Sequence, residues 1–168
     1  MDLKLHVLHM NQCDPKKCTA KKLQRHGLVR IHKTLRSVPI RSIKLNPFAE
    51  KILGTDDADA IKQHGLTVID CSWKHAESVF GSMKLKNDRR LSTIFLAGNP
   101  INYAMPGKLS SVEALAASLI VAGFFEEAES ILSKFSWGHT FLSLNKGRID
   151  DFKKGNSDIK KEIGNNKK

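Results

Sequence analysis

The chain has 168 residues, a hydrophobic fraction of 40% and a formal net charge of +11. A chain of this length and composition can bury a core in one domain or two small ones, which excludes a disordered protein. Its apolar runs fall short of the roughly 18 residues that span a bilayer, so we expect no membrane segment and a cytoplasmic protein. Three cysteines, an odd number, argue against a disulfide framework.

The positive charge is concentrated in the N-terminal third. Residues 1–53 contain 12 Lys and Arg against 3 Asp and Glu, whereas residues 54–148 contain 10 of each kind. A solvated basic face is one explanation of this asymmetry, and an RNA partner is the other. We favour RNA because it explains why the excess is confined to one region.

The first predicted elements are short strands around one basic helix. Residues 3–9 alternate and predict a strand with Leu5, Val7 and His9 on one face and His6 and Leu8 on the other. The sequence then predicts a turn into a helix capped by Asp14, with Pro15 at its first position, and strands at residues 29–31 and 40–45.

Strands alternate with helices in the middle of the chain, which predicts a mostly parallel sheet with covering helices. The expected elements are a helix at residues 56–63 closed by Gly65, buried strands at 66–70 and 91–97, a helical turn at 73–79 and a helix at 126–135. Ser110 and Glu113 form an S-x-x-E capping box for a helix that ends at Gly123.

We therefore expect an α/β protein with three parts. Residues 1–50 form a small, basic, mixed α/β N-terminal domain, and residues 51–152 form the cofactor-binding domain. Residues 153–168 are a polar tail in which any helix is marginal and the last five residues are disordered.

Two groups of residues suggest chemistry at a site. Cys13 and Cys18 lie near His9, but a single C-x4-C pair supplies too few soft ligands for a closed zinc or iron–sulfur site, so we expect structural thiols and no metal. Asp70 ends a predicted buried strand three residues before Trp73. This pair suits a base or hydrogen-bond acceptor beside an apolar wall, and a helix cap followed by a core aromatic is the other interpretation.

The chain contains no G-x-G-x-x-G, G-x-x-x-x-G-K-[ST] or G-x-S-x-G motif. A cofactor must then be held by other means. Backbone amides near Asn99 and at the start of the helix that follows Ser110 are the candidates, and an ordinary loop and cap is the alternative.

Several motifs occur in the order found in the small-subunit rRNA aminocarboxypropyltransferases. They are DPKKCTAKKL (residues 14–23), DCSW (70–73), NPINY (99–103), KLSSVEALAA (108–117) and KFSWGH (134–139). The chain resembles this family from about residue 4 to residue 152. Because it lacks a long acidic tail, it is similar to the archaeal members.

The resemblance implies transfer of the 3-amino-3-carboxypropyl group of S-adenosylmethionine to N3 of a pseudouridine, often already N1-methylated, in small-subunit rRNA during ribosome biogenesis. It also implies a SPOUT-like knotted C-terminal domain and a reaction without a metal. The alternatives are a SPOUT-class rRNA methyltransferase, a non-catalytic rRNA-binding assembly factor, and an iron–sulfur or zinc module formed by the N-terminal cysteines.

Carried over by position, the implied catalytic residues are Asp70, the acid near the reacting chain, and Trp73, the wall residue. The implied cofactor-contacting residues are Thr19, Ile69, Ser92, Gly107 and Ser111. The chain departs from the family pattern at Ser92, where relatives often have Leu-Pro after the arginine, and at Gly107, where they often have an aromatic residue.

The basic residues of the N-terminal third provide the expected RNA contacts. Those expected to bind phosphates are Lys16, Lys17, Lys21, Lys22, Arg25, Arg30 and Lys33. Such contacts supply affinity without base specificity. The expected partner is small-subunit rRNA or a pre-ribosomal particle, and we expect the protein to be a monomer.

Overall fold

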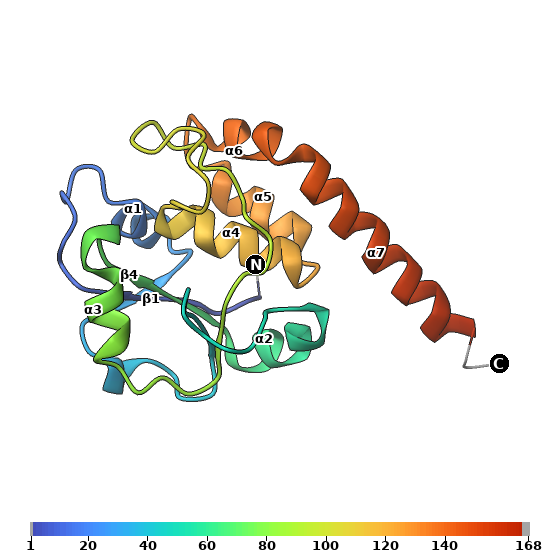
Figure 1. The fold of residues 1–168 in the computed structure, drawn as a ribbon, viewed down its shortest axis with the longest axis horizontal. Helices are drawn as coiled ribbons and strands as arrows, with labels where there is room; N and C mark the ends of the chain where they lie inside the picture. The colour runs from blue at the N-terminus through green and yellow to red at the C-terminus, as the bar shows by residue number, and fades with distance from the viewer. Residues whose placement is uncertain (1, 166–168) are drawn as a thin grey trace.

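A sheet of five parallel strands lies at the centre of the molecule, in the order β2-β1-β4-β3-β5 (Figure 1). The structure is a computed structural model that describes the backbone of residues 2–165 and the side chains of residues 2–155. The strands are β1 (Leu5–His9), β2 (Arg30–His32), β3 (Ile43–Leu45), β4 (Leu66–Asp70) and β5 (Asp88–Arg89). The predicted α/β class with a parallel sheet is confirmed.

Seven α-helices are found in the described part of the chain. They are α1 (Thr19–Arg25), α2 (Ala58–His64), α3 (Ala76–Gly81), α4 (Ser111–Val121), α5 (Phe125–Leu132), α6 (Gly138–Leu144) and α7 (Lys146–Asn165). Short 3₁₀ turns lie at Leu35–Ser37, Thr55–Asp57 and Trp73–His75. Helix α7 projects away from the rest of the molecule (Figure 1). Within the described residues, none of these helices is both long and apolar enough to cross a membrane.

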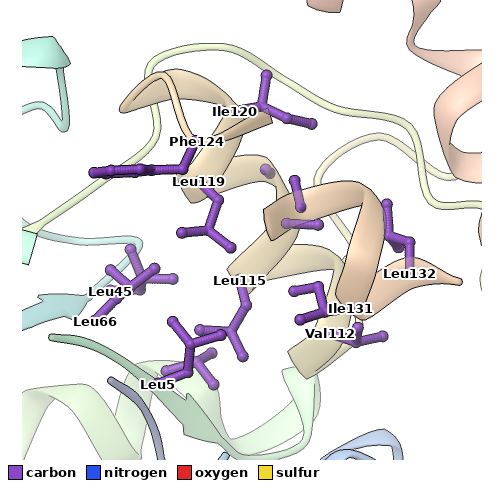
Figure 2. Close-up of a cluster of buried hydrophobic side chains, with 14 of the residues drawn as sticks. Leu5, Leu45, Leu66, Val112, Leu115, Leu119, Ile120, Phe124, Ile131 and Leu132 are labelled. Atoms are coloured by element: carbon purple, nitrogen blue, oxygen red, sulfur yellow. The ribbon is translucent and has the colours of Figure 1, made fainter. Parts of the chain in front are cut away.

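The two faces of the sheet are covered by two separate hydrophobic clusters. Val7 of β1 and Val68 of β4 belong to the larger cluster, which includes residues of α1, α4 and α5. Figure 2 shows part of this cluster, including Leu115 of α4 and Ile131 of α5. Leu8 and Ile69, the residues that follow these two valines in sequence, pack instead with Phe80 of α3. Successive side chains of a strand point to opposite faces of the sheet, which explains this division. The alternation predicted for residues 3–9 is therefore confirmed.

Helix α4 is the central helix of the larger layer. All of its residues except Ala114 are buried, so it is enclosed on every side, as expected for a helix packed between a sheet and another helix. Its predicted capping box is confirmed, because the side chains of Ser110 and Glu113 each accept a hydrogen bond from the backbone N–H of the other residue. The turn before α5 contains Gly123, whose φ of +91° favours glycine.

Two predicted elements are wrong in detail. Residues 91–97 do not form a strand, because the backbone of Leu96 is bonded to the Asn145 side chain and not to a strand of the sheet. The first helix does not begin at Pro15. Asp14 accepts hydrogen bonds from Lys16 N and Lys17 N in a separate turn, and α1 starts after Cys18.

The sheet is continuous across the predicted boundary near residue 50. Strands β1, β2 and β3 come from residues 1–50, and β4 and β5 come from residues 51–152. The division into two domains stays a prediction. Helix α7 extends through residues 153–165, where the sequence indicated at most a marginal helix. Residues 166–168, part of the segment expected to be disordered, lie outside the described residues.

Candidate functional site

Two neighbouring cavities open beside the carboxyl end of β4. The first has a volume of about 510 Å³, and its lining includes Asp70, Trp73 and Ser111. The second has a volume of about 340 Å³ and lies against the segment 89–109. The residues that line both are Leu45, Pro47, Trp73, Leu109 and Ala114. The carboxyl edge of a parallel sheet is where α/β proteins bind their ligands.

Asp70 is the last residue of β4 and lies between α4 and β1. Its Oδ1 accepts a hydrogen bond of 2.6 Å from Ser111 Oγ, at the first turn of α4. Its Oδ2 is 3.2 Å from Nε2 of His9. The parallel register of β1 and β4 pairs His9 with Asp70 directly, so the sheet itself brings these two side chains together.

Two thiols complete a compact polar group around Asp70. The Sγ atoms of Cys13 and Cys18 are each 3.3 Å from His9 Nε2 and each 3.6 Å from Asp70 Oδ2. We call these four residues the His9–Asp70 cluster. Burial, together with a hydrogen bond from Cys18 and the charge of Asp70, raises the pKa of Cys13 to about 12. In the absence of a cation this thiol is therefore protonated at neutral pH.

Trp73 lines both cavities. Its indole N–H donates a hydrogen bond of 3.2 Å to the carbonyl oxygen of Leu109, which ties the end of β4 to the loop before α4. The side chain is 43% exposed, although it lines both cavities. Trp73 is therefore not the core aromatic considered as an alternative, and its ring is accessible to a ligand.

A buried carboxylate holds the loop that closes the site. Glu113 is fully buried, and its two oxygens accept hydrogen bonds from Gly98 N, Asn99 N, Asn99 Nδ2, Ser110 N and Ser110 Oγ. The Asn99 side chain in turn accepts hydrogen bonds from the amides of Ile101 and Asn102, which line the first cavity. The backbone at the cavity wall is thus fixed by a chain of hydrogen bonds from α4.

The same loop is held from the other side by α6. The side chain of Asn145 forms one hydrogen bond with the backbone N–H of Leu96 and another with its carbonyl. Gly98 packs so closely against the backbone of Phe141 that an added Cβ would clash with it. Gly107 has a φ of +69°, so it turns the chain where an aromatic residue would be strained.

A family model described as "Ribosome biogenesis protein, C-terminal" matches residues 43–167. Curated relatives called 16S rRNA aminocarboxypropyltransferase match nearly the whole chain. The protein from Methanopyrus kandleri is 43% identical over 148 residues, or 88% of each chain. The protein from Methanococcoides burtonii is 45% identical over 154 residues, covering 91% of this chain and 87% of the relative. The chain belongs to the 16S rRNA aminocarboxypropyltransferase family.

A solved structure of similar fold supports this membership. The SAM-dependent rRNA:acp-transferase Tsr3 from Vulcanisaeta distributa superposes with a TM-score of 0.85 at 34% identity, covering 92% of this chain and 85% of that one. The resemblance to the small-subunit rRNA aminocarboxypropyltransferases is therefore confirmed at the level of family and fold.

A second family model, "Possible Fer4-like domain in RNase L inhibitor, RLI", matches residues 3–36. Within these residues the only thiols are those of Cys13 and Cys18, and the whole sequence has three cysteines. A four-iron cluster is held by four cysteine thiolates. The chain therefore has too few cysteines to hold a four-iron cluster.

The structure places the predicted cofactor residues around the two cavities, not all within them. Ile69 and Ser111 line the first cavity, and Gly107 lines the second. Ser92 lies between Leu91 and Thr93 of the second cavity without lining it. Thr19 lines neither; its hydroxyl accepts a hydrogen bond of 3.4 Å from Val112 N at the start of α4. These cofactor contacts remain predictions.

The predicted RNA contacts lie on two segments of this family member. Lys16 and Lys17 are exposed in the turn before α1, and Lys17 also lines the first cavity. Lys21, Lys22 and Arg25 belong to α1, while Arg30 and Lys33 are exposed at β2 and just beyond it. The ammonium of Lys22 lies 4.8 Å from the centre of the Phe135 ring, so it is engaged in a cation–π contact.

Proposed function

We propose that this protein transfers the 3-amino-3-carboxypropyl group of S-adenosylmethionine to N3 of a pseudouridine, or of its N1-methyl derivative, in small-subunit rRNA. The other product is 5′-methylthioadenosine. Membership of the 16S rRNA aminocarboxypropyltransferase family supports the reaction. The observation that carries the proposal is the position of a carboxylate and an accessible indole, Asp70 and Trp73, on the wall of one cavity at the edge of the sheet.

The cofactor is proposed to extend across both cavities. Its methionine part occupies the first, near Ile69 and Ser111, and its adenosine part occupies the second, near Gly107. The shared lining residues support one ligand that crosses from one cavity to the other. The fixed loop around Asn99 offers backbone groups for such a ligand, which agrees with the absence of a nucleotide-binding motif in the sequence.

Trp73 is proposed to decide which carbon reacts. A sulfonium activates all three attached carbons, and the one that faces the nucleophile is attacked. A site that buries the methyl group and exposes Cγ transfers the aminocarboxypropyl chain. A cation over an aromatic ring is favourable by about 0.5–2 kcal/mol, so the indole that lines both cavities can hold the sulfonium in that orientation.

Asp70 is proposed to act on the nucleophile. The N3–H of a pseudouridine is a weak acid, and a carboxylate that accepts its hydrogen bond orients the nitrogen toward Cγ. Full proton transfer to a positioned base contributes roughly 10²–10⁴ in rate. Ser111 supports this role by fixing one oxygen of Asp70 with a hydrogen bond of 2.6 Å.

Small-subunit rRNA or a pre-ribosomal particle is the proposed substrate, bound by a monomer in the cytoplasm. The exposed cations before and on α1 support this, because Lys17 lies both on that basic segment and at the first cavity. A SPOUT-like knotted arrangement of the C-terminal part is included in the proposal. The family resemblance and the parallel order of the strands support it.

Calorimetric titration with S-adenosylmethionine tests the cofactor site. We expect binding to the wild type and a loss of about 2- to 30-fold in affinity for Trp73→Ala, the equivalent of the cation–π energy above. Tyr103→Ala is the matched control, because Tyr103 is 58% exposed on the neighbouring loop and lines neither cavity. An absence of binding to the wild type would favour the non-catalytic RNA-binding factor.

A further inference from the structure

The His9–Asp70 cluster brings four atoms that commonly bind metals into one small volume. The ligand atoms of His9, Cys13, Cys18 and Asp70 all lie within 4.8 Å of one another. They come from the end of β1, the following loop, the residue before α1 and the end of β4. We propose that these four side chains bind one zinc ion.

The distances between the four atoms fit a tetrahedral ion. Zinc–ligand bonds of about 2.3 Å to sulfur and 2.0–2.2 Å to nitrogen and oxygen place neighbouring ligand atoms about 3.3–3.8 Å apart. In the cluster, the nitrogen is 3.3 Å from each sulfur and 3.2 Å from the oxygen, and the oxygen is 3.6 Å from each sulfur. These five edges are close to those that a tetrahedral zinc site requires, and the sixth, between the two sulfurs, is at most 4.8 Å.

Hydrogen bonds alone account poorly for the same geometry. The Nε2 atom of a neutral imidazole has either one hydrogen or one lone pair, so it makes one good hydrogen bond in the ring plane. Nε2 of His9 has three close neighbours: the two sulfurs and Asp70 Oδ2. A cation at the centre gives each of the four atoms one bond.

The surroundings of the cluster also fit a metal site. Ligand groups are usually oriented by further hydrogen bonds to their remaining atoms. Asp70 Oδ1 accepts from Ser111 Oγ, and Nδ1 of His9 is 3.0 Å from Asn11 Oδ1. The backbone N–H of Asn11 is also 3.1 Å from Nδ1, which on its own favours the opposite tautomer. Zinc at Nε2 selects the form with hydrogen on Nδ1, which donates to Asn11 Oδ1.

The cluster is partly buried and partly open to the first cavity. An ion can therefore enter from the cavity and is then shielded from solvent. The His9 and Cys18 side chains are buried, at 3% and 6% exposure. Cys13 and Asp70 are partly exposed and line the first cavity, which provides the path from solvent. Two thiolates and an imidazole favour zinc over magnesium or calcium. The sequence-based expectation of no metal considered Cys13 and Cys18 with His9 nearby, and the fold adds Asp70 as a fourth ligand.

A zinc ion here would join the loop after β1 to the end of β4. All four positions are filled by protein side chains, which is typical of a structural site. A zinc ion on Oδ2 would leave the Asp70 carboxylate with lone pairs that still accept a hydrogen bond. The metal proposal does not depend on the proposed transferase activity.

The metal content of the purified protein tests the proposal. The protein is prepared without a metal-affinity tag, incubated with zinc, desalted and measured by inductively coupled plasma mass spectrometry. We expect about one zinc per chain in the wild type and a small fraction of this in Cys13→Ser and Cys18→Ser. Cys71→Ser is the matched control, because Cys71 follows Asp70 directly but lies outside the cluster. It should retain the full content.

Circular dichroism on each variant separates loss of the metal from loss of the fold. Cys13 is the safer variant in this respect, because it is only partly buried. Cobalt substitution gives a second measurement: a tetrahedral site with two thiolates has strong visible absorption and sulfur-to-cobalt charge-transfer bands, which Cys13→Ser should weaken.

Two results would overturn the zinc site. One is a wild type that retains no zinc after desalting, and the other is a folded Cys13→Ser protein that retains as much zinc as the wild type. Titration with S-adenosylmethionine on the same samples keeps the two proposals apart. Cofactor binding without zinc would overturn the metal site alone, and zinc without cofactor binding would overturn the proposed transferase alone.

Discussion

Strand β1 carries two buried histidines, and they lie in opposite chemical environments. His6 faces the same side of the sheet as Leu8, and its Nδ1 is 3.0 Å from Nε2 of His32 on β2. His9 faces the other side and meets Asp70 with two thiols. Both histidines are less than 7% exposed, so burial does not distinguish them.

The difference lies in what each imidazole meets. His6 has no acidic partner: burial first, and then His32 and nearby cations, lower its pKa to about 4. Its Nε2 has no hydrogen-bond partner among the described residues. His9 meets three groups that bind protons or metals. Strand β1 thus carries one neutral, structural histidine inside the sheet. Its other histidine lies among possible metal ligands at the edge where the cavities open.

The largest expected effect is a loss of turnover on replacement of Asp70, at the edge of the sheet. Asp70→Ala removes the carboxylate proposed to act on N3–H, and we expect turnover to fall by roughly 10²–10⁴ with a much smaller change in cofactor affinity. Single-turnover kinetics and calorimetry on the same protein measure both quantities. An effect on affinity alone would reassign Asp70 to holding the amino group of the cofactor.

The histidine inside the sheet should make the fold sensitive to acid. The pKa of His6 is about 4 in the folded protein and 6.5 in its unperturbed state, so the unfolded chain binds the extra proton between these values. The contribution of His6 to the free energy of unfolding is complete above pH 6.5. It decreases as the pH falls toward 4, by at most about 3 kcal/mol. Urea unfolding across this range measures the loss.

His6→Leu and an exposed control sharpen that test. His6→Leu removes the titrating group, so its stability should fall less steeply between pH 6.5 and 4. The slope should not vanish, because burial also lowers the pKa of His32. His139→Gln, on an exposed histidine, should follow the wild type. Equal slopes for wild type and His6→Leu would show that His6 contributes nothing to the acid response.

The smallest expected effect concerns the basic segment beside the cavity. Lys17→Ala with Lys21→Ala should weaken binding of small-subunit rRNA fragments and lower the salt dependence of the affinity, by about 0.7–0.9 in the log–log slope for each phosphate that the variant no longer binds. Lys62→Ala, an exposed lysine on α2, is the matched control. An unchanged slope in the double variant would remove α1 from the RNA interface.

Local signals in the sequence were sufficient for much of the fold. The alternation in β1 and the capping box of Ser110 with Glu113 depend on residues close together in the chain, and both are confirmed. The predicted strand at residues 91–97 was wrong because its apolar pattern does not reveal that Leu96 binds Asn145, which is 49 residues away. A short apolar run does not by itself define a strand, and Ile94 within this run is 61% exposed.

The site was predictable only in part for the same reason. Asp70 and Trp73 could be proposed because they end a recognisable strand, and the structure places both on one cavity. The contact of His9 with Asp70 depends on β1 lying beside β4 in register, a pairing across 61 residues that the sequence does not specify. Without that pairing, Cys13 and Cys18 are two thiols with too few partners.

Isotope transfer to RNA tests the central claim most directly. Small-subunit rRNA is incubated with the protein and with S-adenosylmethionine labelled either in the methyl group or in the aminocarboxypropyl chain. We predict that the chain label appears in the RNA nucleoside, while the methyl label leaves in 5′-methylthioadenosine. Methyl label in the RNA would make the protein a methyltransferase, and no label in the RNA from either cofactor would contradict the transferase proposal.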